Sequence, residues 1–591
     1  MRFIAAIVSF VIAFMMIGYG IAQRTVLSGP DDITASTHVS ADAPVMVIDG
    51  KALAAMPNRQ KIKIGGASPV FAAYGRTSDV LAWVGDARHN KIGFDAEKVS
   101  LTSQLVRGTE TEVPDPSTSD LWLGQYRSDG ALAFTANIPS DVSLLVVSDG
   151  TKPAPSTVSV SWPVDNRTPW SGPLIAGGAL LLAIGLGLFL WALIAERRSK
   201  GPRRKPPKGP KNQKMPRLPR PQTYKRTAPR VIVAPKGRRS IGRMVAVVPA
   251  ILVATLVTSG CSPDLWPTAT DVGQPSPSLT ESATTLGAAQ LDPPVLSATQ
   301  VENIMASVSA VAKKADAAGD AKLLATRFAG PALAIRTANY KIRKVDRTYD
   351  APTPIPARPI ALTLPQQSNT WPRTVLTVMQ EPANPDVKPV ALMLTQQSPR
   401  ANYLVQYAVK LEARAVLPKV APANVGAVRL QEDVPLLAMH PNELALAFGD
   451  ILAAGDKSKH AEQFDLEDDP LLKQIGVDSR RALAKKLPKS AKMAYTNLQG
   501  DAESIALATS ASGAIVAVYL EENLVVKPVE RGASVNAEGA VKSLSKVTST
   551  TKGTSALYGD QLLFSVPAVG SDEKIELLGW ETGLVAAKEL P

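Results

Sequence analysis

Two Ser-x-x-Lys patterns are the residues of this sequence whose types and spacing most resemble a catalytic arrangement. Ser543 precedes Lys546 by three positions, and Ser549 precedes Lys552 by three. In acyl-transfer enzymes this spacing places a serine nucleophile beside a lysine, but those enzymes also carry Ser-Asp-Asn and Lys-Thr-Gly motifs. The sequence contains neither companion motif. These serines and lysines therefore do not predict acyl transfer.

The remaining residues suited to chemistry are an acidic cluster, four histidines and one cysteine. Asp465, Glu467, Asp468 and Asp469 could offer oxygen ligands to Ca²⁺, but they lack the spacing and the glycine of a calcium loop. We interpret them as a solvated acidic loop. The few histidines and the single cysteine exclude a Cys/His zinc site and an internal disulfide framework. Metalloprotease, nucleophile-elbow and phosphate-loop motifs are also missing from the sequence. We therefore expect no catalytic residue, metal or cofactor.

Length and composition limit the architecture. A chain of 591 residues is too long for one core and predicts roughly two to four folded units. With 45% hydrophobic and 20% charged residues, it is neither a wholly disordered chain nor a transporter built mainly from apolar helices. The formal charge of +13 is uneven, because residues 196–243 carry +17 and the remainder carries −4.

An apolar run covers residues 3–22 and follows Arg2. At about 1.5 Å per residue it is long enough to cross a hydrocarbon core of roughly 30 Å. A cleaved signal peptide has a shorter apolar region, so we interpret this run as an uncleaved transmembrane anchor. Residues 20–22, Gly-Ile-Ala, fit a small-residue cleavage site and keep the cleaved alternative open.

A second apolar run, residues 174–195, has no charge, and Trp170 and Trp191 lie near its ends, as at a membrane surface. It predicts a transmembrane helix. Basic residues beside such a helix stay in the cytoplasm, so this helix runs inward, the first runs outward, and residues 24–173 lie outside. The topology-determining basic residues are Arg197, Arg198, Arg203, Arg204, Lys205, Arg238, Arg239 and Arg243.

Residues 196–243 are expected to form a proline-rich cytoplasmic linker. Nine prolines between Pro202 and Pro235 favour extended geometry, and the segment has too little apolar surface to fold. Its charge also fits contact with anionic lipid headgroups. Nucleic-acid binding is the weaker alternative, because Tyr224 is the one aromatic residue among the charges. We expect no specific nucleic-acid partner.

A third apolar stretch, residues 244–260, ends at Cys261, the only cysteine in the chain. Residues 236–261 combine a basic region, a short apolar region and a small-residue end, and they resemble a bacterial lipoprotein signal. The resemblance implies lipidation of Cys261 and cleavage before it, with recognition by Val257, Thr258, Ser259 and Gly260. Thr258 departs from the usual Leu or Val. The alternative is a short third transmembrane helix. Either reading places residues 262–591 outside.

Residues 24–172 contain short apolar stretches separated by turn residues, which predicts an all-β, sandwich-like external domain. His89 is expected on an exposed turn rather than in a site. The predicted strands are 45–48, 62–64, 80–84, 131–134, 144–147 and 158–162.

After a proline-containing tether at 262–296, helical periodicity precedes strand patterns twice. Ala-Ala-Gly-Asp ends a helical stripe at residues 317–320 and again at 453–456, and a phenylalanine follows each aspartate by eight residues. The offset of 136 residues indicates an internal duplication. We predict two α+β copies, at 297–430 and 436–591.

The order of elements in each copy resembles NTF2-like cone folds. Residues 371–374, Trp-Pro-Arg-Thr, with residues 395–400 and Tyr403, further resemble an uncharacterised actinobacterial envelope lipoprotein family over about 297–591. The resemblance implies no catalytic residue. NTF2-like folds can hold a ligand in their cone, and His440 and His460 flank the helix that would line it.

These features together predict a non-enzymatic membrane-anchored envelope protein, with external domains 24–173 and 262–591 and a cytoplasmic linker. Its expected partners are membrane lipid and an envelope protein or cell-wall polymer. One alternative is an envelope enzyme or ligand-binding protein that uses a cone pocket. Another is lipid or nucleic-acid binding through the basic linker.

Overall fold

The computed structural model of this protein describes residues 2–27, 29–40, 42–164, 168–199, 292–380, 387–413 and 415–591. The chain divides into two compact units. One contains the two apolar helices, and the other combines residues 34–162, the N-terminal domain, with the C-terminal domain from residue 292. The predicted third apolar segment, the tether before residue 292 and most of the basic linker lie outside the described residues.

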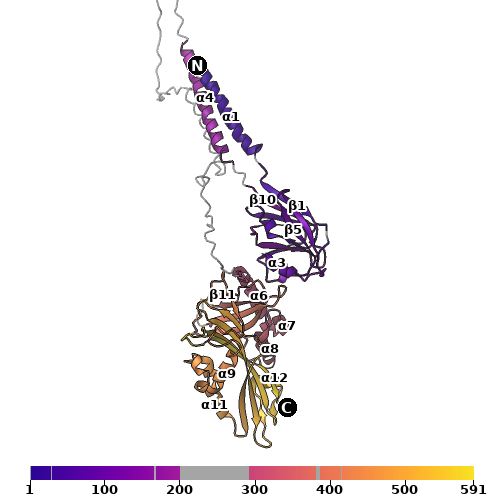
Figure 1. Ribbon diagram of the computed structural model, residues 1–591, viewed down its shortest axis with the longest axis vertical. Coiled ribbons are helices and arrows are strands. Elements are labelled where there is room, and N and C mark those ends of the chain that lie inside the picture. The colour runs from indigo at the N-terminus through magenta and orange to yellow at the C-terminus, as the bar shows by residue number, and fades with distance from the viewer. Residues whose placement is uncertain are drawn as a thin grey trace, which may run out of the picture. The chain divides into compact units, whose positions relative to one another are not determined.

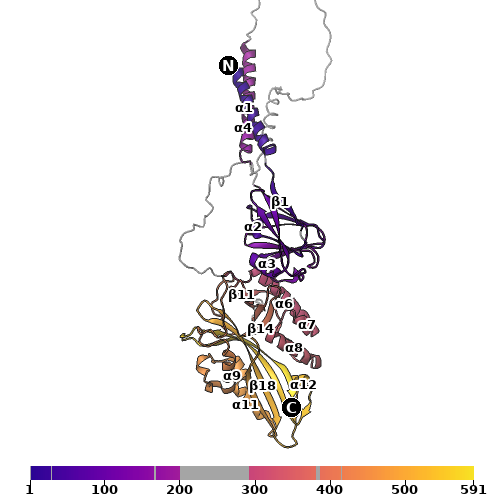
Figure 2. The same ribbon diagram turned by 45° about the vertical axis from the view of Figure 1, so that its right-hand side comes forward.

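The first two predicted transmembrane segments are helices α1 (Arg2–Thr25) and α4 (Ser171–Ser199). By length and composition, 23 residues of α1 and 27 of α4 are able to cross a membrane. The two helices lie side by side in both ribbon views (Figures 1 and 2). A Cβ on Gly178 would lie 3.0 Å from the backbone oxygen of Ala13, so glycine permits this close approach. Small residues at such contacts are typical of paired membrane helices.

The N-terminal domain is built from two β-sheets and two short helices. The helices are α2 (Gly50–Leu53) and α3 (Thr77–Val84). The strands are β1 (Asp32–His38), β2 (Val45–Ile48), β3 (Gln60–Gly65), β4 (Val70–Arg76), β5 (His89–Asp95), β6 (Ser100–Val106), β7 (Gly124–Ser128), β8 (Leu132–Ala136), β9 (Val142–Val147) and β10 (Thr157–Pro163). The sheet orders are β1-β10-β3-β8 and β6-β5-β2-β9-β4-β7.

The two sheets share one core. Ile62 and Val160 of the smaller sheet pack in the same buried cluster as Met46 and Leu144 of the larger one. Alternating burial along β3 and β10 matches the period of two expected for strands with one solvent-facing side. Two sheets on one core are therefore present, but the domain is not all-β as predicted, because it also contains α2 and α3. The larger sheet is mixed, because β2 and β5 are parallel.

Two further predictions for this domain are wrong. Residues 80–84 belong to helix α3 and not to a strand, because five consecutive apolar residues carry no period of their own. Asp79 in the first turn and Gly85 after the last residue, with φ of 59°, favour the helix over the strand. His89 begins β5, is buried, and its Nδ1 lies 2.9 Å from the carbonyl of Ala87, so it is not on an exposed turn.

The C-terminal domain combines helices with one large sheet (Figure 1). Its α-helices are α6 (Ala298–Ala318), α7 (Ala321–Leu324), α8 (Gly330–Val345), α9 (Leu444–Ala454), α10 (Pro470–Ile475), α11 (Val477–Lys486) and α12 (Gly539–Ser545). Its strands are β11 (Ile360–Pro365), β12 (Arg373–Met379), β13 (Val390–Gln396), β14 (Leu404–Leu411), β15 (Arg429–Leu430), β16 (Ala491–Gln499), β17 (Ile505–Ala508), β18 (Ala514–Pro528), β19 (Val535–Asn536), β20 (Ser549–Thr550), β21 (Thr554–Val566) and β22 (Glu576–Glu589).

Strands from both predicted copies belong to a single ten-stranded sheet. Its order is β11-β12-β13-β14-β22-β21-β18-β17-β15, and β16 pairs with β18. The two halves join through two residue pairs, Lys410 with Trp580 and Leu411 with Gly579. The predicted helix-then-strands order is present twice along the chain, whereas the internal duplication itself stays a prediction.

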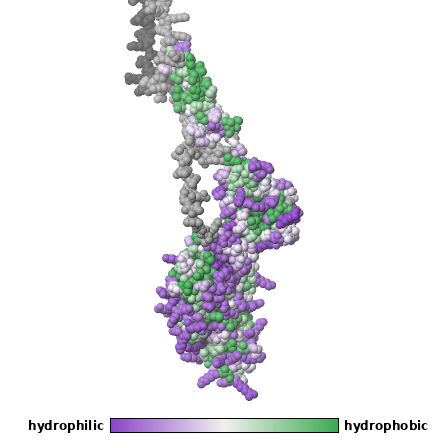
Figure 3. Space-filling model, in the orientation of Figure 1, coloured by the Kyte–Doolittle hydropathy of each residue, from purple (hydrophilic) through white to green (hydrophobic). Residues whose placement is uncertain are grey.

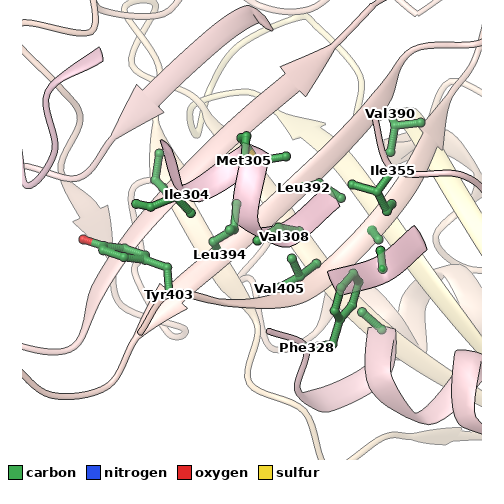
Figure 4. Packing of buried hydrophobic residues seen from close by; sticks show 14 of the residues in the cluster. Ile304, Met305, Val308, Phe328, Ile355, Val390, Leu392, Leu394, Tyr403 and Val405 are labelled. Carbon is green, nitrogen blue, oxygen red and sulfur yellow. The ribbon is translucent and has the colours of Figure 1, made fainter. Parts of the chain in front are cut away.

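Three large hydrophobic clusters and one smaller cluster of α8, β21 and β22 organise this domain. One packs α6, α7 and α8 against β12, β13 and β14, and Figure 4 shows Met305 and Val308 of α6 beside Leu392 and Leu394 of the sheet. The second packs α9 and α10 against β17, β18, β21 and β22. There the rings of Phe448, Phe464 and Phe564 lie 5.3–5.9 Å apart. The third joins side chains of both sheet halves, including Tyr407 and Leu563.

Candidate functional site: a charged docking interface

The most deeply buried ion pair among the described residues of the N-terminal and C-terminal domains joins Arg373 to Asp79. Nη2 of Arg373, at the start of β12, lies 2.7 Å from Oδ1 of Asp79 in α3, and the two side chains are 0% and 1% exposed. Arg76 donates from Nε to the other oxygen of Asp79 at 3.1 Å. The Arg373 guanidinium also stacks 3.7 Å from the ring of Trp371. A buried pair that lost either partner would leave an uncompensated charge, so it fixes the two domains in one arrangement.

A second ion pair repeats this pattern nearby. Nη1 of Arg327 lies 2.6 Å from Oδ2 of Asp120, and both side chains are largely buried. The backbone N–H of Tyr403 donates to the same oxygen at 2.8 Å. Burial raises the pKa of the Asp120 carboxyl, and the Arg327 charge opposes that rise. The aspartate is therefore stabilised by two donors that both belong to the C-terminal domain.

Arg400 contacts the C-terminal end of α3. Its Nε and Nη2 donate to the carbonyl oxygens of Trp83 and Val84, both at 2.8 Å, and Nη2 also lies 2.7 Å from a carboxylate oxygen of Glu110. The last carbonyls of a helix lack intrahelical partners and carry partial negative charge. A guanidinium is suited to this position because it presents several donors in a fixed plane.

The first residues of the C-terminal domain complete the interface. Arg76 donates from Nη1 to the carbonyl of Pro294 at 2.9 Å and from Nη2 to that of Val295 at 2.7 Å. Gln300 donates from Nε2 to the carbonyl of Leu121 at 2.8 Å. Gln300 also closes the capping box of α6 with Ser297. The same glutamine thus begins a helix and binds the neighbouring domain.

An apolar centre accompanies these charges. Trp83 and Trp122 lie 5.8 Å apart in a buried cluster of the N-terminal domain, and Trp371 of the C-terminal domain packs against that cluster. Nε1 of Trp371 donates to Gln396 at 2.9 Å, so its polar edge is satisfied. Large buried aromatic and arginine side chains are the usual energetic centres of protein interfaces. We call the contacts of Asp79, Asp120 and Glu110 with Arg327, Arg373 and Arg400 the docking interface.

Apolar side chains occupy the space expected to form a ligand-binding cone. Between α9, the helix flanked by His440 and His460, and the sheet they include Phe448 and Phe564. Between α6 and the sheet they include Ile304, Leu394 and Val405 (Figure 4). A cavity of about 170 Å³ remains beside α8. It is lined by Ala332, Ile335, Arg336, Asn339, Tyr349, Asp350, Ala351, Pro352, Thr353, Ile355, Val390, Ala408, Lys410, Gln561 and Glu581.

The two cationic side chains of this cavity each have an acidic partner. Arg336 donates from Nη1 to both carboxylate oxygens of Asp316. Lys410 lies 3.4 Å from Glu581, which also accepts from the hydroxyl of Thr353. His440 and His460 do not line it. Its lining residues include no histidine.

A buried acid lies on the other half of the sheet. Asp560 of β21 is 1% exposed, and burial raises the pKa of its carboxyl to about 6, although the hydroxyl of Thr582 and the charge of Arg480 oppose the rise. Arg480 of α11 pairs with Glu522 of β18, and its guanidinium lies over the ring of Tyr495 at 4.4 Å. Arg480 is the one fully buried residue of α11, so this charge cluster holds the helix to the sheet.

The structure places few of the sequence-predicted site residues together. Cys261 and the recognition residues Val257, Thr258, Ser259 and Gly260 lie outside the described residues, as do Arg203, Arg204, Lys205, Arg238, Arg239 and Arg243. Arg197 is exposed near the end of α4, and Arg198 belongs to the same helix. These residues stay predictions.

The motifs considered for catalysis and calcium have local structural roles. Ser543 Oγ donates to the carbonyl of Gly539 within α12. Asp469 caps α10 by accepting from the N–H of Leu472, and Asp468 pairs with Lys473. Within the described part of the chain, no group of three or more His, Cys, Asp or Glu residues is placed to hold a metal ion.

Sequence reasoning missed the docking interface. Trp371, Arg373, Arg400 and Tyr403 stood in the motif that carried the family resemblance, yet nothing in the sequence linked them to Asp79, 294 positions before Arg373. Asp79 directly precedes the apolar residues 80–84. A charged residue beside a buried apolar segment needs a buried partner, and this was the available sequence signal for the interface.

Comparison with known proteins gives one match. No curated protein and no solved structure matches the chain. A family described as a domain of unknown function, DUF8094, matches residues 292–589, which is just over half of the chain and covers nearly all of the C-terminal domain. The match begins at the first described residue of that domain, two positions before the carbonyl that binds Arg76. The chain therefore belongs to the DUF8094 family.

Proposed function

We propose that this protein is a non-enzymatic, membrane-anchored scaffold of the cell envelope, whose N-terminal and C-terminal domains act as one binding body outside the membrane. The observation that carries the proposal is the docking interface, with Arg373 and Asp79 buried between the domains. Helices α1 and α4, each long and apolar enough to cross a membrane, bracket the N-terminal domain in the sequence.

The docking interface supports the expected topology. Two spans on either side of residues 34–162 leave that domain on one face of the membrane and residue 200 on the other. Docking requires residues 292–591 to share the face of the N-terminal domain. The chain must then return between residues 200 and 291, where the apolar stretch 244–260 is the one segment of suitable composition. The basic residues that precede it, from Arg197 to Arg243, favour the cytoplasmic face for the linker.

We also propose that the return segment is a lipoprotein signal ending at Cys261, and that the C-terminal domain is a duplicated NTF2-like fold. The signal-like run 236–261 supports the first point. Helical layers on each half of the ten-stranded sheet support the second. The filled space under α6 supports a binding role over an enzymatic one.

Cysteine accessibility tests the topology. Starting from Cys261→Ala, single cysteines replace Lys98 in the N-terminal domain and Lys574 in the C-terminal domain, both of which are exposed. A membrane-impermeant maleimide is expected to label both on intact cells. Lys208→Cys in the linker is the matched control and should label only after permeabilisation. Protection of Lys574→Cys on intact cells would overturn the shared-face topology.

A second candidate function is binding of a small polar molecule in the cavity beside α8. Its buried polar lining, with Arg336 and Gln561, favours this alternative. Ala351 is an exposed residue at the rim, so Ala351→Leu would narrow the cavity without disturbing the core. A thermal-shift screen of small molecules identifies ligands of the wild type. A ligand that stabilises Ala351→Leu as much as wild type would bind outside this cavity.

A further inference from the structure

One end of the C-terminal domain gathers an excess of positive charge. Residues 485–492, 527–552 and 588–591 contain ten lysine and arginine side chains against three carboxylates, a net side-chain charge of +7. All ten cations are exposed: Lys485, Lys486, Lys489, Lys492, Lys527, Arg531, Lys542, Lys546, Lys552 and Lys588. We call this surface the basic end. The chain outside the linker carries −4 in total, so the sign of the basic end is opposite to that of the whole chain outside the linker.

Strand register places these residues together although the sequence separates them. Lys492 of β16 lies directly opposite Lys527 of β18. The pairing of β18 with β21 ends at Val526 and Thr554, and Lys552 lies two positions before Thr554. Lys588 of β22 pairs with Ser555 of β21. The backbone of Val529 also donates to the carbonyl of Ser490 at 2.8 Å. Four neighbouring strands thus present their lysines at one sheet end, at steps of about 4.8 Å.

The domain's own acids do not neutralise this charge. Some exposed cations elsewhere on the C-terminal domain have acidic partners, such as Lys473 with Asp468 and Arg358 with Glu302, whereas others, such as Lys313 and Lys344, have none among the described residues. Within the described residues, none of the ten cations of the basic end lies within 4.0 Å of a carboxylate. Like charges directly opposite on adjacent strands, as at Lys492 and Lys527, destabilise a sheet. A negatively charged partner would relieve this repulsion between lysines, so the surface fits such a partner.

The composition of the basic end distinguishes among anionic partners. Nine of its ten cations are lysines, which bind phosphate as point charges, whereas the planar fork of arginine forms directed bidentate pairs with carboxylate or phosphate. A lysine surface therefore fits a repeated charge better than one oriented acidic group. The three segments contain no aromatic residue. Nucleic-acid surfaces use aromatic side chains to stack bases, and membrane-surface segments use them to enter the headgroup layer. A phosphate polymer without bases requires neither base stacking nor entry into a headgroup layer, so it needs no aromatic side chain.

The basic end also lies far from the docking interface. Figures 1 and 2 show α11, α12 and the C-terminus at the end of the C-terminal domain opposite α6, and Figure 3 shows hydrophilic side chains at that tip. Docking on the N-terminal domain therefore leaves it uncovered. We propose that the basic end binds an envelope polymer with repeated phosphodiester groups. This inference rests on the proposed function for the location of the polymer and adds the binding surface and the partner's chemistry.

Polymer binding by the full chain in phosphatidylcholine nanodiscs tests the proposal. The probe is poly(glycerol phosphate), with dextran as the uncharged reference. The variant combines Lys489→Gln, Lys492→Gln, Lys527→Gln and Lys552→Gln. It is expected to bind at least about tenfold more weakly than wild type, because four of the ten cations of the surface are lost. Wild-type affinity should also fall steeply with salt, as counterion release requires.

A matched variant controls for net charge, which matters because the linker is also basic. Lys313→Gln, Lys314→Gln, Lys341→Gln and Lys344→Gln remove four exposed lysines of α6 and α8. This control should lose less than about threefold. Equal losses in the two variants would overturn the proposal, and so would tighter binding to phosphatidylglycerol vesicles or to single-stranded DNA than to the polymer. Cysteine labelling reports the topology separately, so loss of polymer binding and a wrong location are distinguishable.

Discussion

Nη2 of Arg373 lies 2.7 Å from Oδ1 of Asp79, and the two residues, 294 positions apart, belong to different domains and are both excluded from solvent. Through this contact the N-terminal domain contributes to the stability of the DUF8094 domain. It also brings together parts of the chain that the linker and the third apolar segment separate in sequence.

Removing one partner of this pair should destabilise the docked arrangement strongly. Arg373→Met leaves the Asp79 carboxylate buried beside Arg76 alone, and we expect a loss of about 3–5 kcal/mol. The double variant Asp79→Leu with Arg373→Met should recover much of that loss, because neither member of the fully buried pair remains. Arg76 loses its carboxylate partner but is partly exposed and keeps its bonds to the carbonyls of Pro294 and Val295. Chemical denaturation followed by tryptophan fluorescence measures both. Arg358→Met, which breaks an exposed pair with Glu302, is the control and should cost less than about 1 kcal/mol.

The cap of α6 separates helix stability from docking. Ser297→Ala removes the hydroxyl that accepts from the N–H of Gln300 and should cost about 1 kcal/mol. Gln300→Ala removes the other half of the capping box and also the bond to the carbonyl of Leu121. Hydrogen exchange is expected to rise in α6 for both variants but around Leu121 only for Gln300→Ala. Equal exchange around Leu121 in the two variants would contradict this assignment.

The stability of the protein should depend on pH through Asp560. Burial raises the folded-state pKa of this carboxyl to about 6, above the ordinary value of 3.8. As pH rises, the unfolded chain releases this proton first, so stability is undiminished below about pH 4 and falls between pH 4 and 6. Above pH 6 the ionised group lowers stability by a constant amount of up to about 3 kcal/mol.

Asp560→Asn removes the ionisation and tests that sign. The melting temperature of Asp560→Asn minus that of wild type is expected to be larger at pH 7.5 than at pH 4. At pH 4 both side chains are neutral in the folded protein. The measurement at pH 4 serves as the internal control for packing changes. A constant difference at all pH values would show that Asp560 does not carry this dependence.

Cleavage at Cys261 should give two chains that remain together. If the lipoprotein signal is processed, a C-terminally tagged fragment of residues 261–591 appears and carries labelled palmitate, whereas Cys261→Ala leaves the full chain. The docking interface predicts that the tagged fragment copurifies with the N-terminal piece. Asp79→Arg, which opposes Arg373, should release that piece while processing continues. A full-length wild-type chain without label, unchanged in Cys261→Ala, would end the lipoprotein hypothesis.

Local patterns predicted most elements of the fold, and long-range contacts were beyond them. The alternation of residues 158–162 and the helical stripe from Val301 to Ala312 both gave the observed strand and helix, because each pattern records which side faces a core. Residues 80–84 failed because an apolar run without polar residues shows no period. The merger of both sets of strands into one sheet depends on two residue pairs between β14 and β22, which no local pattern encodes.

The candidate site was less predictable than the fold for the same reason. Arg373 and Arg400 stood within recognisable segments, but their partners in α3 and near Glu110 are defined only by docking. The basic end was invisible to counts of net charge along the chain, because register between β16, β18, β21 and β22 assembles it from three separate segments.

The place of β22 in the sheet has a consequence for biosynthesis. β22 is the last strand in chain order, yet it lies between β14 and β21 and provides the pairing that joins the two halves. A ribosome releases this strand after every other strand of the domain, so the continuous sheet is completed only once synthesis has passed Glu589. Until then the earlier strands have an open edge on each half. In the topology proposed above, this delay would keep the chain suited to passage through a translocation channel until its last strand has been made.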